Sequence, residues 1–342
     1  MKNILSIDGG GIRGILPASI IAHLEKRLQL ETGDEDARVS DFFDLLSGTS
    51  AGGILTCLYL VPEKREDGTV RPKYTACMAA NLYSELGPLL FKKSIGYVLR
   101  SGFGLLRSRY CEDELYEFSK RLLGDSYISE VMKDCLITAY DLSSRKALLF
   151  SKYSTHKYGD MADYKLCDIV RSTSAAPSYF IPSQIFAKDG GSRHLVDGGV
   201  YASNPAMCSY VEAIKIWPGE PVSNLWMLSV GTGKVLKPYH FKNTKHFGYL
   251  HWLNPILDIL MSSVSETVDY QVQQIFSIAG VPQNYIRIEP PMLNADTKID
   301  NASSKNIERL KSAAQNFIDH NSPLFDSICK TLTDGKELVK KG

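Results

Sequence analysis

Several protein classes are excluded by what this chain of 342 residues lacks. Its seven cysteines are scattered and include no C-x-x-C pair, a pattern that argues against a disulfide framework or a zinc site and favours a reducing compartment. The net charge is only +1, so no overall field favours a nucleic-acid polymer as a partner. Internal repeats, low-complexity tracts and clear linkers are also missing, and we interpret residues 1–342 as a single domain.

A membrane-spanning run is missing as well. The longest uncharged stretch, residues 45–62, carries several glycines, serines and threonines in its first half, which favours a buried strand, turn and helix over a transmembrane helix. The first eight residues become polar too soon for a signal peptide. We therefore expect a cytoplasmic protein that is peripheral at the inner face of the membrane when active.

Short apolar runs alternate with amphipathic stretches along the chain. We predict strands at residues 4–7, 42–46, 135–140, 147–153, 194–196, 225–230 and 285–288, and helices at 16–30, 51–59, 112–123, 165–174, 205–217, 255–279 and 303–319. This alternation indicates an α/β fold whose mostly parallel sheet is covered on both faces. In such sheets the functional sites lie beyond the carboxyl ends of the strands.

The segment Gly48-Thr49-Ser50-Ala51-Gly52 stands between a predicted strand and a predicted helix. A nucleophile elbow needs this arrangement, because Gly48 and Gly52 carry no side chain that would clash beside the tight turn and Ser50 is exposed at its tip. Taken alone, a Gly-x-Ser-x-Gly segment is more often a simple connecting turn. The strand-turn-helix context and two further motifs favour Ser50 as a nucleophile.

A glycine loop, Asp8-Gly9-Gly10-Gly11-Ile12-Arg13-Gly14, follows the first predicted strand. Its glycine amides can form an oxyanion hole. The same residues match the G-x-G-x-x-G fingerprint, so a dinucleotide-dependent oxidoreductase is the alternative function. Asp8 is a poor neighbour for a pyrophosphate, and the acidic residues near 31–36 lie in a hydrophilic loop rather than at the end of a second strand, where a ribose would bind. Arg13 either braces the loop, holds an anionic headgroup or is an ordinary surface arginine.

The third motif, Asp197-Gly198-Gly199, follows a short predicted strand and supplies a candidate base. None of the seven histidines stands in a motif, and those at 240, 246 and 251 share a basic loop that is more typical of solvated surface. An aspartate is a weak base at its usual pKa of about 3.9, so Asp197 would need desolvation or a short hydrogen bond to activate a serine. The competing interpretation is a turn aspartate that caps its own loop.

With these motifs in this order, the chain resembles the patatin-like phospholipase family. The matching segments are 8–14, 48–52 followed by Gly53, the alanine-proline segment 172–180, and 197–199, so the motifs lie within residues 4–235 and the helices of 255–342 are expected to pack on that unit.

The resemblance implies a three-layer α/β/α fold and a Ser50–Asp197 dyad that cleaves acyl esters of membrane phospholipids through an acyl-serine. It also implies an oxyanion hole from Gly9, Gly10 and Gly11, no metal and no required cofactor. Arg13, Gly14, Gly48, Gly52, Gly198 and Gly199 would support the site. A non-catalytic lipid-binding module that retains the fold is a further alternative.

Two stretches without acidic residues stand out. Residues 91–110 mix cations with aromatic and aliphatic residues, which suits either a phospholipid membrane surface or a packed lid. Residues 234–251 combine lysines, histidines and aromatics, which suits a nucleotide or a solvated loop. The chain also resembles bacterial patatin-like phospholipases of anti-phage systems, and this implies activation by a cyclic dinucleotide. The long helix predicted at 255–279 fits either the core or the surface of a homo-oligomer.

Overall fold

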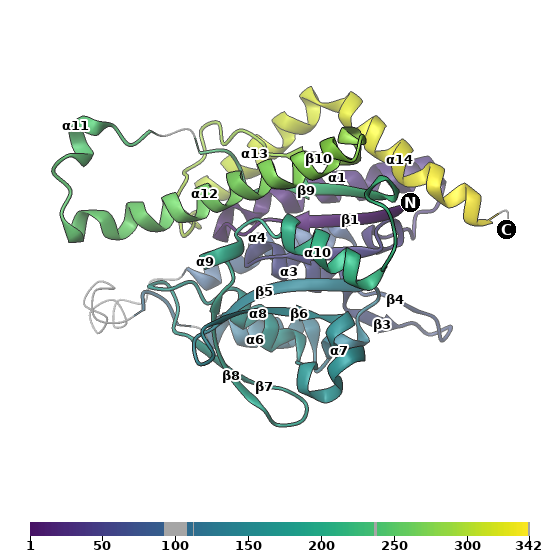
Figure 1. The fold of residues 1–342 in the computed structure, drawn as a ribbon, viewed down its shortest axis with the longest axis horizontal. Coiled ribbons are helices and arrows are strands. Elements are labelled where there is room, and N and C mark those ends of the chain that lie inside the picture. The colour runs from purple at the N-terminus through teal and green to yellow at the C-terminus, as the bar shows by residue number, and fades with distance from the viewer. Residues whose placement is uncertain (92–107, 112, 236–237, 341–342) are drawn as a thin grey trace.

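The structure is a computed structural model that describes residues 1–91, 108–111, 113–235 and 238–340 (Figure 1). The strands are β1 (Lys2–Ile7), β2 (Leu45–Gly48), β3 (Pro62–Lys64), β4 (Val70–Pro72), β5 (Asp134–Asp141), β6 (Lys146–Ser151), β7 (Ser183–Phe186), β8 (Ser192–Asp197), β9 (Leu225–Val230) and β10 (Tyr285–Ile288). The helices are α1 (Ile15–Thr32), α2 (Val39–Phe42), α3 (Ala51–Leu60), α4 (Ala76–Leu90), α6 (Asp113–Leu123), α7 (Lys152–Tyr158), α8 (Leu166–Thr173), α9 (Gly199–Ala202), α10 (Ala206–Ile216), α11 (Phe241–Thr244), α12 (Tyr249–Ile278), α13 (Ser304–His320) and α14 (Ser322–Lys340).

The central sheet runs in the order β10-β9-β1-β2-β5-β8-β7, with β6 paired to β5 off this path. The pairs from β10 to β5 are parallel, which confirms the predicted mostly parallel α/β sheet. The pairs β5–β6, β5–β8 and β8–β7 are antiparallel, an extension that the sequence did not predict. Beyond the carboxyl ends of β1 and β2 lie the glycine loop and Ser50.

The two faces of the sheet enter two different cores because side chains alternate along each strand. Leu5, Ile7 and Leu46 belong to the larger core, together with residues of α1, α3, α4, α13 and α14. Ile4 and Leu45 face the opposite way and pack with residues of α10 and α12. The result is a helix, sheet, helix layering, and the C-terminal helices contribute to both outer layers (Figure 1).

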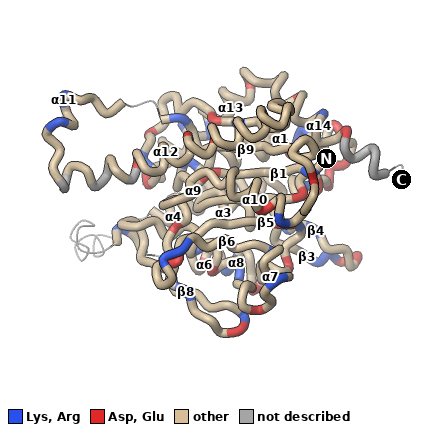
Figure 2. Tube along the Cα trace, viewed as in Figure 1, with Lys and Arg blue, Asp and Glu red and all other residues tan. Residues whose placement is uncertain are grey.

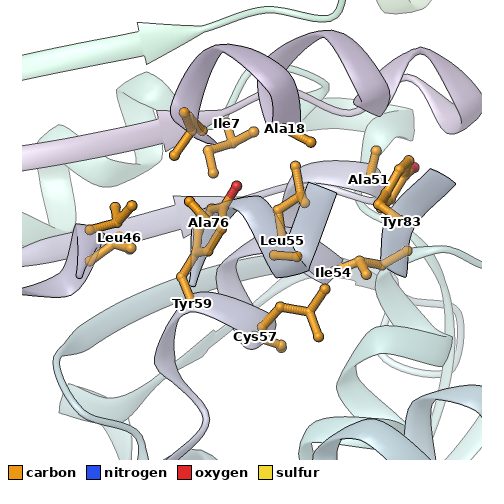
Figure 3. Packing of buried hydrophobic residues seen from close by; sticks show 14 of the residues in the cluster. Ile7, Ala18, Leu46, Ala51, Ile54, Leu55, Cys57, Tyr59, Ala76 and Tyr83 are labelled. Carbon is orange, nitrogen blue, oxygen red and sulfur yellow. The ribbon is translucent and has the colours of Figure 1, made fainter. Parts of the chain in front are cut away.

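Helix α3, which follows Ser50, is buried along its whole length. Figure 3 shows Ile54, Leu55 and Tyr59 of this helix between the strand residues Ile7 and Leu46 and the neighbouring helices α1 and α4. A helix that is apolar all round belongs in the interior of a protein. The uncharged stretch 45–62 is therefore core, as predicted, and no helix within the described ranges is both long and apolar enough to cross a bilayer.

Several boundaries differ from the sequence-based expectation. Phe42 ends α2 instead of starting a strand, and β2 begins only at Leu45. Helix α12 starts at Tyr249, well before Pro255, although a proline inside a helix lacks the N–H of one backbone hydrogen bond. The residue at the N-cap of α10 is Pro205, while the Asn204 side chain still accepts a hydrogen bond from the Ala206 N–H at 2.9 Å.

A Gly52→Ala substitution should destabilise the fold strongly. A Cβ on Gly52 would lie 2.1 Å from the Ile7 carbonyl oxygen, a backbone atom of the central strand that cannot move away locally. We expect a loss of about 3 kcal/mol in the free energy of unfolding, the upper end of the usual cost of overpacking. Chemical denaturation provides the measurement.

Gly248→Ala is the matched control, because nothing lies within 4 Å of the Cβ that it would add. It should leave the unfolding midpoint nearly unchanged. Equal midpoints for both variants would show that the approach of α3 to β1 is looser than these distances imply.

Candidate active site

Ser50 sits on a strained turn between β2 and α3. Its backbone has φ 51° and ψ −116°, a conformation that costs a non-glycine residue on the order of 1–3 kcal/mol. The turn is also tight, because a Cβ on Gly48 would lie 2.1 Å from the carbonyl oxygen of Gly52. The two glycines therefore have the steric role expected of them, and the turn exposes the Ser50 side chain to a cavity.

A chain of buried hydroxyl groups holds this turn in place. The Ser50 N–H donates to Thr173 Oγ1 at 2.8 Å, and Thr173 Oγ1 donates to the Thr138 carbonyl oxygen at 2.7 Å. Thr49 Oγ1 lies 2.7 Å from Thr138 Oγ1 and donates to the Ala202 carbonyl oxygen at 2.6 Å. The strained residue is thus tied to the end of α8, to β5 and to α9, which fixes the direction of its side chain.

Asp197, at the end of β8, lies beside Ser50 in the same buried region. Its N–H donates to the Ala175 carbonyl oxygen at 3.0 Å, and its Oδ1 accepts from the Gly199 N–H at 2.7 Å. Burial raises the pKa of Asp197 to about 7, although hydrogen bonds from the Gly199 N–H and the Ser50 hydroxyl partly oppose this rise. A carboxyl group with this pKa can accept and return a proton near neutral pH.

The alanine-proline segment 172–180 connects these two residues. Thr173 supports the Ser50 amide, and the Ala175 carbonyl oxygen binds the Asp197 amide. Gly198 allows close contact here, since a Cβ at that position would lie 2.0 Å from Thr138 Oγ1. The segment therefore fixes the nucleophile candidate relative to the base candidate.

The glycine loop is held by its carbonyl groups. The Gly9 oxygen accepts from Thr232 Oγ1 at 2.9 Å, the Gly10 oxygen from the Arg13 N–H at 3.2 Å, and the Gly11 oxygen from the Tyr83 hydroxyl at 2.7 Å. With every carbonyl engaged, the orientation of the peptide groups is fixed.

The amide groups of the loop are not equivalent. The Gly9 N–H donates to the Ser203 carbonyl oxygen at 2.8 Å, so it cannot also bind a substrate oxygen and the expectation for Gly9 must be corrected. Within the described residues the amides of Gly10, Gly11 and Ala51 have no partner. Because Ala51 begins α3, its amide also lies at the positive end of the helix dipole.

The environment of the loop disfavours the dinucleotide alternative. A Cβ on Gly10 would lie 2.3 Å from Thr232 Oγ1, and one on Gly11 would lie 2.3 Å from the Ile299 carbonyl oxygen. These glycines admit neighbouring segments of the same chain rather than a pyrophosphate. Gly14 serves packing in the same way, against Ala51 and Tyr83 at 2.8 Å.

A buried ion network lies directly beneath the glycine loop. The Arg287 guanidinium of β10 donates to both carboxylate oxygens of Asp8, at 2.8 and 2.6 Å, and also pairs with Glu289. Burial disfavours the charged guanidinium, but Asp8 and Glu289 outweigh it and raise the pKa of Arg287. Glu289 in turn accepts from the Gly233 N–H at 2.7 Å. Arg287 therefore links β10 to the residue that precedes the loop.

Arg13 is buried and lines the cavity, so it is not an ordinary surface arginine. Its Nε donates to the Gly10 oxygen at 3.4 Å, a long contact that braces the loop. Burial lowers the pKa of Arg13, and nearby acids such as Glu289 and Asp258 counteract this. No ion pair binds its guanidinium among the described residues, which leaves donors facing the cavity.

The cavity has a volume of about 1070 Å³ and contains both Ser50 and Asp197 in its wall. Its wall is mixed: Ile54, Leu90 and Phe180 are apolar, and Arg13 and Arg109 are cationic. A long apolar chain that ends in a polar group matches this composition.

Sequence reasoning missed Arg287, Glu289, Thr232 and Tyr83. A signal for Arg287 was present, because it stands between two isoleucines in a predicted strand, and a buried arginine requires an acidic partner. Thr232 stood in a Gly-Thr-Gly segment after a strand. Neither pattern indicates which residue would be the partner. Asp8 and Arg287, for example, are separated by 279 positions in the chain.

The predicted membrane segment 91–110 falls mostly outside the described residues. Its described ends turn inward: Tyr110 is buried against Phe91, with ring centroids 5.3 Å apart, and Arg109 stacks on Tyr179. Its contact with a membrane stays a prediction.

The family profile described as "Patatin-like phospholipase" matches residues 5–207, which include all the motifs around the cavity. An elbow serine beside a buried aspartate, on a mostly parallel α/β sheet, is consistent with this match. The chain belongs to the patatin-like phospholipase family. Membership supports a lipid acyl hydrolase activity in general terms.

Relatives align with most of the chain. "Patatin-like protein 2" of Oryza sativa subsp. indica is 32% identical over 95% of this chain and 86% of its own length. "Patatin-16" of Solanum tuberosum is 32% identical over 93% and 84%, and "Probable inactive patatin-3-Kuras 1" of the same plant is 31% identical over 93% and 86%. Among solved structures, VipD from Legionella pneumophila covers 95% of this chain and 67% of its own, at 13% identity and a TM-score of 0.39, a similarity too low to support an argument.

An Arg287→Met substitution should destabilise the protein in a pH-dependent way. It leaves Asp8 and Glu289 buried without their cation, and breaking such a pair costs about 3–5 kcal/mol. Burial already raises the pKa of both carboxyls, and losing Arg287 raises them further. Stability lost in the variant should therefore be largest at pH 8 and smaller at pH 5, where the carboxyls bind protons.

Arg27→Met is the control, because Arg27 forms an exposed pair with Asp326 that is worth less than about 1 kcal/mol. Urea denaturation at several pH values measures both variants. A loss for Arg287→Met that does not change with pH would contradict the buried-charge explanation.

Proposed function

We propose that the protein is a phospholipase A-type serine acyl hydrolase, a carboxylic ester hydrolase, in which Ser50 and Asp197 form a catalytic dyad. The observation that carries the proposal is the contact of the Ser50 hydroxyl with a buried aspartate whose pKa is about 7, at the wall of a large cavity. Among the described residues no histidine hydrogen-bonds to either side chain, which supports a dyad over a triad.

The geometry suits acyl transfer in two steps. Ser50 Oγ attacks the ester carbonyl carbon while its proton passes to Asp197, and the amides of Gly10, Gly11 and Ala51 bind the oxyanion. When the intermediate collapses, the ester bond breaks and the leaving alkoxide takes the proton from Asp197. Water then attacks the acyl-serine and gives a proton to Asp197. When this second intermediate collapses, the bond to Ser50 Oγ breaks, Asp197 returns the proton to that oxygen, and the fatty acid leaves. No metal is needed for these steps.

The cavity supports a phospholipid as the substrate class. Ile54, Leu90 and Phe180 suit an acyl chain, and the unpaired guanidinium donors of Arg13 suit the phosphate of a headgroup. Arg13 would then both brace the glycine loop and orient the lipid.

Ser50→Ala and Asp197→Asn should each abolish release of fatty acid from phospholipid vesicles while the fold remains intact by circular dichroism. A fluorophosphonate probe should label the wild type but not Ser50→Ala, because Ser50 stands at the strained elbow, contacts Asp197 and faces the cavity. His194→Ala is the control and should retain activity, because His194 lies outside the cavity wall. Loss of activity in the histidine variant would indicate a catalytic triad instead of a dyad. Labelling that persists in Ser50→Ala would show that Ser50 is not the nucleophile.

The reaction should depend on pH through Asp197. Because only the ionised carboxylate accepts the serine proton, kcat/KM should rise with pH through about 7 and then level off. An unburied aspartate would give a flat profile above pH 5. The effect on stability runs the other way. Between about pH 4 and 7 the folded chain keeps a proton on Asp197 that the unfolded chain loses, so Asp197 lowers the free energy of unfolding as the pH rises through this range. A flat activity profile from pH 5 to 9 would contradict this role.

One relative carries the printed name of a probable inactive patatin, so a non-catalytic lipid-binding module is the second candidate. The intact Ser50–Asp197 contact favours the enzyme. Vesicle binding without any Ser50-dependent release of fatty acid would favour the module.

Activation by a cyclic dinucleotide in anti-phage defence is a further part of this proposal. The basic stretch 234–251 contributes Tyr239, His240 and Phe247 to the cavity wall, so a nucleotide bound there would lie beside the cavity that contains Ser50. Fatty-acid release should increase when a panel of cyclic dinucleotides is added, with the mononucleotides as the control. Equal rates with every nucleotide would contradict the activation.

A further inference from the structure

The segment formed by residues 238–260, called the arm below, extends beyond the body of the protein. It contains α11 and the first part of α12, and Figure 1 shows it projecting away from the sheet and the other helices. The body holds α12 at Met261 and beyond, where the Met261 carbonyl oxygen accepts from Ser203 Oγ at 2.7 Å and Ser265 Oγ donates to Asp8 at 3.2 Å. Farther along, Val272 and Phe276 are core residues.

Several large apolar side chains of the arm are exposed and lie outside the lining of the cavity, and we call them its outer face. Trp252, Ile256 and Ile259 are exposed and stand at i, i+4 and i+7, so they share one face of α12. Ile256 is 47% exposed, and Phe241 of α11 is 79% exposed. None of these four side chains lines the cavity. A grouped apolar face of this kind indicates an interaction surface, whereas single exposed apolar residues need no explanation.

The charge of the arm selects among possible partners. It carries Lys242, Lys245 and three histidines, with no acidic residue before Asp258 (Figure 2). The Asp258 carboxylate accepts from the Tyr239 hydroxyl at 2.8 Å. Lysines beside aromatic and aliphatic side chains suit an anionic lipid surface, whereas two copies of the arm would bring like charges together.

The inner side of the arm belongs to the cavity that contains Ser50. Tyr239, His240 and Phe247 line this cavity together with Leu260, so the arm is one of its walls. A surface that held the outer face of the arm would therefore lie beside one wall of the cavity that contains Ser50.

We propose that the outer face of the arm, formed by Phe241, Trp252, Ile256 and Ile259 with Lys242 and Lys245, docks on an anionic phospholipid bilayer. The apolar side chains insert at the level of the acyl chains, and the lysines bind the headgroups. The arm thereby holds the cavity entrance at the membrane. This inference rests on the proposed lipid hydrolysis for its purpose, but the binding can be measured separately.

The test compares vesicle binding of the full-length protein by flotation. Wild type should bind vesicles that contain phosphatidylglycerol more tightly than vesicles of phosphatidylcholine alone, and added salt should weaken the difference. Phe241→Ser with Ile256→Ser should lower the affinity at least about tenfold, because two large apolar side chains that leave water on binding are then replaced by polar ones. Lys242→Glu with Lys245→Glu should remove the preference for phosphatidylglycerol.

Leu30→Ser with Ile278→Ser is the matched control. Both side chains are large and exposed, Ile278 at 85%, but they lie outside the arm, and their loss should leave vesicle binding unchanged. Hydrolysis of a soluble short-chain ester separates docking from chemistry. The Phe241/Ile256 variant should retain that rate, and Ser50→Ala should lose it.

Three results would overturn the proposal: equal vesicle binding by wild type and the Phe241/Ile256 variant, no preference of the wild type for phosphatidylglycerol, or a wild-type dimer that the variant dissociates while vesicle binding is unchanged. The last result would assign the face to a second copy of the chain. If the arm variant loses vesicle binding but wild type hydrolyses no ester, the docking surface stands and the proposed enzymatic function fails.

Discussion

The close approach of α3 to β1 is the constraint on which the rest of the site depends. The backbone oxygens of Ile7 and Gly52 stand where Cβ atoms on Gly52 and Gly48 would be, so the chain can only turn sharply at Ser50. The turn costs backbone strain, and buried packing of α3 offsets it (Figure 3). Thr173 then supplies the one acceptor that the Ser50 amide needs.

Around that turn, burial provides the electrostatics. Water is excluded from Asp197, which raises its pKa toward neutrality, and Asp8 is kept as a partner of Arg287 deep beneath the glycine loop. The two aspartates thus have different environments: Asp197 lies beside the Ser50 hydroxyl without a cationic partner among the described residues, and Asp8 is paired with Arg287. The Gly9 amide belongs to this framework through Ser203, whereas the amides of Gly10, Gly11 and Ala51 have no partner among the described residues.

The cavity joins these parts to the arm. Its wall includes Ser50 and Asp197 together with Pro255, Asp258 and Leu260 of α12. Along helix α12, Ser265 therefore hydrogen-bonds to Asp8, Val272 packs in the core and Trp252 is exposed to solvent.

The sequence by itself determined the alternation of strands and helices, the elbow at Ser50, the position of Asp197 at a strand end and the family, because these depend on local patterns and fixed spacing. Only the tertiary structure decided that Arg287 binds Asp8, that Thr173 supports Ser50 and that the Gly9 amide is engaged. It also decided the antiparallel end of the sheet and the overhang of α12 beyond Pro255. Such contacts join residues far apart in the chain, and local pattern carries no information about which distant group will satisfy a buried charge or amide.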